Sequence, residues 1–166
     1  MFASAVLLAG TADVACAQFT TLTVTASPAP FTVTTATAGS QPAAISNALT
    51  SYFVKAKNPA GAQKISAAFD VPMMPGTSLT LQMGASAGAT SLGPVALDVT
   101  TRDIVVNIDK ENGSTLPITY VFSATVAAGV VVSQTRTVTL TMSSYPYPQV
   151  GLSAHQLVAP RAISRH

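Results

Sequence analysis

Residues 107–114, with the sequence NIDKENGS, hold the densest group of oxygen-bearing side chains in the chain. Asn107, Asp109 and Glu111 alternate along this stretch, and oxygen ligands at alternate positions are what calcium takes in loop sites. The glycine falls at position 113, one place later than the EF-hand pattern requires. These three residues are therefore candidate calcium ligands.

The same stretch also fits a purely structural role. The dipeptide Asn112-Gly113 suits the two central positions of a type I′ turn. We therefore expect a hairpin that joins a strand at 103–108 to a strand at 118–126, with calcium binding as the alternative.

Acid–base and nucleophilic chemistry have few parts in this chain. A Ser-His-Asp hydrolase needs a histidine held against a serine, and the two histidines, His155 and His166, lie close to the C-terminus. A pair of carboxylates, Asp98 with Asp103 or Asp109, is the remaining possibility for an enzyme. We expect these carboxylates to cap turns at strand ends instead, and we expect no catalytic residue, no cofactor and no enzyme activity.

The composition limits the partners. Charged residues make up 8% of the 166 residues and the formal net charge is +2, so the surface must consist largely of hydroxyl and small apolar side chains. Such a surface attracts polyanions poorly, which argues against nucleic-acid binding. The chain has no Trp, the residue that most often forms a sugar-binding platform, and Tyr145 and Tyr147 are the candidate exposed aromatics.

Residues 1–17 differ from the rest. Their apolar run, FASAVLLAG, is too short to span a bilayer, and Ala15-Cys16-Ala17 fits the small-x-small rule for signal-peptidase cleavage before Gln18. We expect a secretory signal peptide, hence a secreted or cell-surface protein, with acylation of Cys16 as the alternative. Cleavage after Ala17 would leave no cysteine, so packing and backbone pairing must stabilise the mature domain.

Residues 18–142 are expected to form one β-sandwich domain. Short runs rich in Thr, Val and Ala are separated by Pro, Gly and Asn, and no long helical period is present. This spacing predicts an all-β, antiparallel, immunoglobulin-like sandwich of about seven to nine strands. The expected strands are 19–26, 31–37, 50–56, 63–71, 78–83, 95–99, 103–108, 118–126 and 131–142.

Alternation predicts which side chains face the core. Tyr52 and Val54 are expected to point inward. A second stripe contains Ile118, Tyr120, Phe122, Ala124 and Val126, and it is expected to pack against Val138, Leu140 and Met142 from the facing sheet. Residues 43–49 are expected to form an irregular connection between sheets, with a helical turn as the alternative.

Residues 143–166 are expected to be a tail outside the domain. They contain Pro146, Pro148 and Pro160 and no acidic residue. This proline density predicts a flexible or polyproline-like segment rather than a strand. A solvated end is expected, and an interaction segment that docks elsewhere is the alternative.

The signal-like start, the uncharged Thr/Val/Ala strands and the final TRTVTLTM strand resemble secreted bacterial immunoglobulin-like sandwiches and, more loosely, pilin-type subunits of extracellular fibres. The resemblance implies association by strand addition, in which one subunit completes the sheet of another. The candidate donor strand is residues 19–26, with Phe19, Leu22, Val24 and Ala26 as its interaction residues. The alternative is that this strand pairs within its own domain.

The sequence thus predicts a secreted, non-catalytic structural or surface-interaction subunit whose partner is a protein, through self-association or a surface component. No nucleic acid and no membrane span are expected. The alternative function is a binding module for glycan or calcium.

Overall fold

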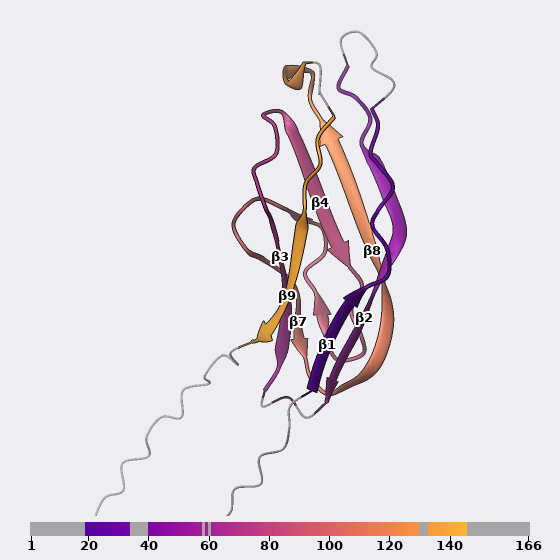
Figure 1. The fold of residues 1–166 in the computed structure, drawn as a ribbon, viewed down its shortest axis with the longest axis vertical. Helices are drawn as coiled ribbons and strands as arrows, with labels where there is room; N and C mark the ends of the chain where they lie inside the picture. The colour runs from indigo at the N-terminus through magenta and orange to yellow at the C-terminus, as the bar shows by residue number, and fades with distance from the viewer. Residues whose placement is uncertain (1–18, 34–39, 58, 60, 130–132, 146–166) are drawn as a thin grey trace, which may run out of the picture.

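The computed structural model describes residues 19–33, 40–57, 59, 61–129 and 133–145. Strands account for nearly all of the regular structure in these ranges, joined by one 3-10 turn, η1, at Val126–Ala128 (Figure 1). The strands are β1 (Phe19–Val24), β2 (Ile45–Lys57), β3 (Gln63–Phe69), β4 (Thr77–Met83), β5 (Thr90–Ser91), β6 (Val95–Ala96), β7 (Arg102–Ile108), β8 (Glu111–Ala124) and β9 (Val138–Ser144).

The nine strands form two antiparallel sheets, which confirms the expected β-sandwich. One sheet has the order β1-β2-β8-β4-β6 and the other has the order β5-β7-β3-β9. Every pair of neighbouring strands is antiparallel. The two sheets lie face to face, and both described chain ends lie at the same end of the sandwich (Figure 1).

The core lies between the inner faces of the two sheets. Tyr52 and Val54 are 0% and 1% exposed, which confirms the inward direction predicted from alternation. In β8 the stripe Ile118, Tyr120 and Ala124 is also buried. Burial of each large side chain stabilises the fold by about 1.5–3 kcal/mol. The residues shared by the two sheets in this core include Ile65, Leu81, Met83, Ile104, Val105 and Ile108.

The predicted stripe of β8 is correct only as far as Ala124. Val126 is 59% exposed, because the strand ends and the chain turns into η1. Phe122 is partly buried, and Val138, Leu140 and Met142 of β9 also pack partly buried against the core, as expected.

Two predicted assignments near the N-terminus are wrong. Residues 43–49 do not form an irregular connection, because β2 already begins at Ile45 opposite Phe122 of β8. A register shift between Asn47 and Thr50 accommodates this early start and leaves Leu49 89% exposed. Residues 31–33 form no strand, and residues 34–37 lie outside the described residues. Pro28 and Pro30 cannot donate to a ladder, so this stretch lies beside the sheet without regular pairing.

Three strands are shorter than predicted at one end. β1 stops at Val24, β6 stops at Ala96, and β9 begins only at Val138 and continues to Ser144. Asp70 and Arg136 hold residues 133–137 in place through side-chain bonds, so this stretch has no ladder partner of its own.

The predicted hairpin at Asn112-Gly113 is also wrong. β7 and β8 belong to different sheets, and the chain crosses between them through Asp109 and Lys110. Asn112 and Gly113 lie within β8, where together they span the step that Lys55 alone spans on β2. This is a β-bulge, and Gly113 adopts a φ of 123° that favours glycine. The Asn-Gly signal therefore marked a backbone irregularity, but of a different kind.

Replacement of Gly113 by alanine should destabilise the protein more than the same change at Gly88. Both residues have positive φ, but a Cβ at Gly113 would lie 2.9 Å from the Phe53 ring, whereas a Cβ at Gly88 meets nothing within 4 Å. We expect a loss in the free energy of unfolding of about 1 kcal/mol for Gly88→Ala and about 2–3 kcal/mol for Gly113→Ala. Urea denaturation of the two variants measures the difference, and equal losses would contradict the contact with Phe53.

Candidate functional site

A groove of about 1650 Å³ runs along one side of the sandwich, between β1 and the segment that follows it on one wall and β9 on the other. β1 is the edge of its sheet and pairs only with β2, while β9 is the edge of the other sheet and pairs only with β3. Each therefore has one backbone edge without a strand partner among the described residues. The groove lies where these two edges face each other across the gap between the sheets.

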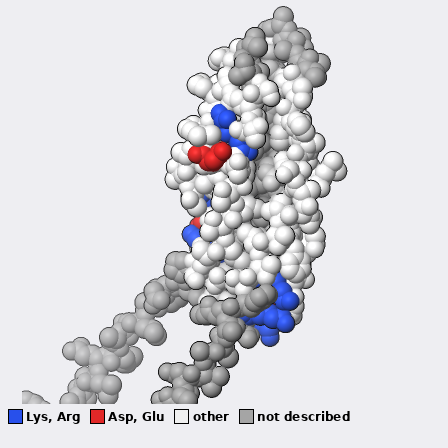
Figure 2. All heavy atoms as spheres, in the orientation of Figure 1, with Lys and Arg blue, Asp and Glu red and all other residues white. Residues whose placement is uncertain are grey.

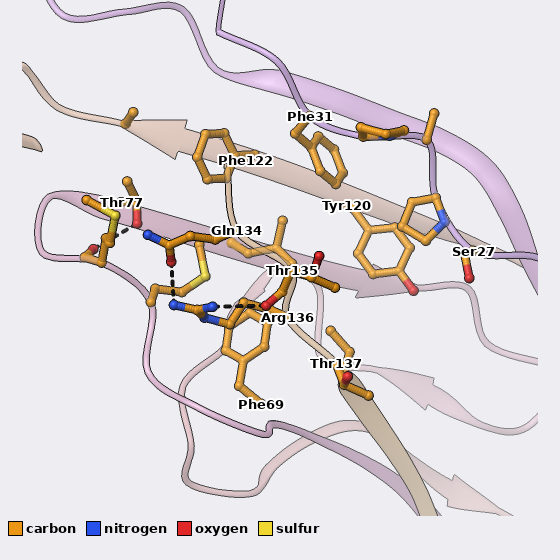
Figure 3. A pocket seen from close by; sticks show the side chains of 18 of the residues that line it. Ser27, Phe31, Phe69, Thr77, Tyr120, Phe122, Gln134, Thr135, Arg136 and Thr137 are labelled. Atoms are coloured by element: carbon orange, nitrogen blue, oxygen red, sulfur yellow. Dashed lines mark hydrogen bonds between the residues drawn. The ribbon is translucent and has the colours of Figure 1, made fainter. Parts of the chain in front are cut away.

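Core side chains form the floor of the groove. Phe31 stacks on Phe122 with ring centroids 6.1 Å apart and an interplanar angle of 28°. Figure 3 shows both rings, with Tyr120 and Phe69 beside them, directed into the same space. Leu22 of β1 and Leu140 of β9 line the two walls and pack against the core while only partly buried. The groove is therefore an incompletely covered part of the hydrophobic core.

Polar contacts fix the upper wall of the groove, residues 133–137. The Asp70 carboxylate accepts hydrogen bonds from the backbone N–H of Val71 at 2.8 Å and of Thr137 at 3.1 Å. Arg136 donates to the Pro72 carbonyl at 3.1 Å and also to Gln134 and to the Thr135 carbonyl (Figure 3). The Thr137 N–H holds the pKa of Asp70 below its ordinary value. These bonds tie the chain just before β9 to the end of β3.

The groove carries almost no charge. Arg136 is the one charged residue in its lining, and its guanidinium is already occupied by the three oxygens named above. Figure 2 shows this face as nearly uncharged, with Lys and Arg gathered at its lower end. Such a lining suits an uncharged, partly apolar chain segment and offers nothing to orient an ion.

The candidate calcium ligands are used locally. Asn107 lies at a bulge in β7 with a φ of 57°, and Asp109 follows this strand. The Glu111 carboxylate accepts from the Gly113 N–H at 3.1 Å and from the Ser114 hydroxyl at 2.9 Å. Burial raises the pKa of Glu111, and these hydrogen bonds lower it further, to a net value below the ordinary one. Within the described residues, no three His, Cys, Asp or Glu side chains are grouped to hold a metal.

The candidate carboxylate pair is likewise engaged. Asp98 binds Arg102 at 2.5 Å and the Thr100 N–H at 2.6 Å, so it caps a turn as expected. Asp103 binds Lys64 at 2.9 Å. His155 and His166 lie outside the described residues.

The candidate donor strand occupies β1. Phe19 to Val24 pair with Lys57 to Tyr52 of β2 in the same chain, which is the self-pairing alternative. Leu22 packs against the core and Val24 is 40% exposed, while Ala26 lies beyond the strand and lines the groove. Exchange of this strand between chains stays a prediction, because a single chain is described.

Sequence reasoning missed the groove and the residues that shape it. Phe31 was assigned to a strand, and Asp70 and Arg136 were not singled out. The one available signal was the pair of prolines before Phe31, which prevents a continuous ladder there.

No protein-family model, curated protein or solved structure matches the chain. Among the described residues, no helix is long and apolar enough to cross a membrane. The groove is therefore the feature on which a functional proposal rests.

The folded protein should lose stability below about pH 4, in part through Asp70. Its pKa is lowered on folding from an ordinary value of 3.8, so its contribution is present above that value and is lost as the pH falls through the lower folded pKa. The Asp70→Asn variant lacks this contribution at every pH. Thermal unfolding between pH 7 and pH 2 should therefore show a gap between wild type and variant that narrows on acidification; a constant gap would contradict the role of the carboxylate charge.

Proposed function

We propose that the protein is a secreted, non-catalytic structural or surface-interaction subunit that associates with further copies of itself by strand addition at the groove. The observation that supports this most directly is an apolar groove bordered by two long, uncharged strand edges. Export rests on residues 1–17, which lie outside the described residues.

The four sheet edges are protected very unequally. Soluble proteins usually blunt edge strands by making them short or by placing charge or proline on them. β5 and β6, the edges away from the groove, have two residues each. β1 and β9, the edges at the groove, have six and seven residues, and neither contains a charged residue or a proline. The unprotected edges are thus the two that face the apolar lining.

Strand addition would satisfy both features at once. An added strand supplies backbone hydrogen bonds to an open edge, and its alternate side chains fill the pockets beneath it. The groove has room for on the order of fifty waters at about 30 Å³ each, and their release from an apolar lining is favourable.

The donor in this proposal is the segment 19–26 of a neighbouring copy. β1 is bound to its own domain by one ladder, to β2, and Leu22 is its one residue packed against the core cluster. Residues 25–33 and 40–44, which lead to β2, contain no strand and can change direction when β1 leaves. A neighbour's segment that takes the place of β1 on β2 makes a head-to-tail contact, and repetition of this contact gives a filament.

The substitution Leu22→Lys should prevent association, and Thr23→Lys should not. Leu22 lines the groove and packs on the core, whereas its neighbour Thr23 is exposed on the other face of the strand. We expect light scattering and negative-stain microscopy to detect concentration-dependent oligomers for wild type and Thr23→Lys, and at least about tenfold weaker association for Leu22→Lys, the cost of burying a lysine charge.

A chain that begins at Pro30 provides the matching control. It should remain folded and monomeric, because it keeps the rest of the sandwich but has no donor strand. If wild type is instead a monomer at every concentration and the shortened chain unfolds, β1 belongs permanently to its own domain and the proposal fails.

A further inference from the structure

The free edge of β9 is the part of the groove that exchange of β1 leaves uncovered. Val138, Leu140 and Met142 of β9 point toward the groove and are partly buried, while Thr139 and Thr141 alternate with them on the exposed side. β3 pairs with one edge of β9, and no described strand pairs with the other. A neighbour's segment on β2 adds to the opposite sheet and cannot supply these bonds.

The chain itself continues past this edge. β9 ends at Ser144, and the Tyr145 N–H donates to the Ala62 carbonyl at 2.7 Å, so the chain stays beside β3 up to that residue. Residues 146–166 follow, starting from the end of the sandwich at which β9 terminates (Figure 1). Pro146 and Pro148 cannot extend the ladder, and proline is common in the turns of hairpin loops.

The sequence after these prolines matches the β9 edge. Residues 149–159, QVGLSAHQLVA, contain no proline, aspartate, glutamate, lysine or arginine, as suits a neutral groove. A five-residue loop over 144–148 is a common hairpin length. In antiparallel pairing it sets Val150, Leu152 and Ala154 opposite Met142, Leu140 and Val138, and Gly151, Ser153 and His155 opposite Thr141, Thr139 and Thr137. Apolar residues thus meet the groove and polar ones meet solvent; a slip of one residue would reverse this.

We propose that residues 149–159 of the same chain form a tenth strand, antiparallel to β9, that covers the groove from the side of the second sheet. The short loop gives this segment an effective concentration in the millimolar range at its own groove, far above that of another chain. This inference goes beyond the proposed function and stands without it, because it concerns closure of β9 within one chain and not association through β2.

A disulfide tests both the pairing and its register. Directly opposed residues in an antiparallel pair have Cα atoms about 4.5–5.5 Å apart, within the range that a disulfide bridges. The test pair is Thr139→Cys with Ser153→Cys, both on the solvent side, in the full chain with Cys16→Ser so that no other thiol is present. The control pair, Thr139→Cys with Ala154→Cys, places the second thiol one residue out of register.

The expected result is a bond within one chain, formed about a hundredfold faster than bonds between chains at roughly 10 µM protein. Non-reducing electrophoresis and peptide mapping distinguish the two. Bonds mainly between chains, or bond formation no faster than in the control pair, would overturn the proposal. Neither result bears on the Leu22→Lys comparison, so failure here and failure of strand exchange are distinguishable.

A second measurement does not depend on disulfide chemistry. Leu152→Lys should increase the fluorescence of a dye that binds exposed apolar surface, because the groove is uncovered, whereas Ser153→Lys should leave it unchanged. Equal fluorescence in the two variants would overturn the proposed register.

Discussion

Backbone hydrogen bonding at the sheet edges is the constraint on which the rest of this structure depends. Inside each sheet the ladders satisfy the N–H and C=O groups, but every sheet ends in two strands with one open side. Two of the four edges here are two-residue strands, β5 and β6, and two are long, β1 and β9. Since the long edges are those that border the gap between the sheets, the sandwich is closed along one side and open along the other.

The core follows from this arrangement. β8 lies in the middle of its sheet, and its inward residues, such as Ile118, are completely buried between the sheets. Toward the β1 and β9 side the same strand contributes Phe122, which is only partly buried and stacks on Phe31 instead of on a facing strand. Burial therefore decreases across the sandwich, and the aromatic residues collect where it is least complete.

Charge has a local role in this protein. Asp70, Asp98 and Glu111 each accept backbone N–H groups close to a strand end or a bulge, so their carboxylates stabilise irregular backbone. With 8% charged residues, the chain has little left to repel other chains from its open edges. The same composition that makes the fold simple thus makes its edges adhesive.

The sequence by itself determined the all-β class and the positions of β3, β4 and β7 to within about two residues, because alternation and turn residues are local properties. It also determined that Tyr52, Val54 and Ile118 face inward. Only the tertiary structure decided that β7 and β8 lie in different sheets, that Asn112-Gly113 is a bulge, and that Phe31 packs without a ladder. Each of these depends on which distant strand lies alongside, as does the groove between β1 and β9. Strand pairing joins residues far apart in the chain, and the local pattern that predicts a strand is the same whichever neighbour it finds.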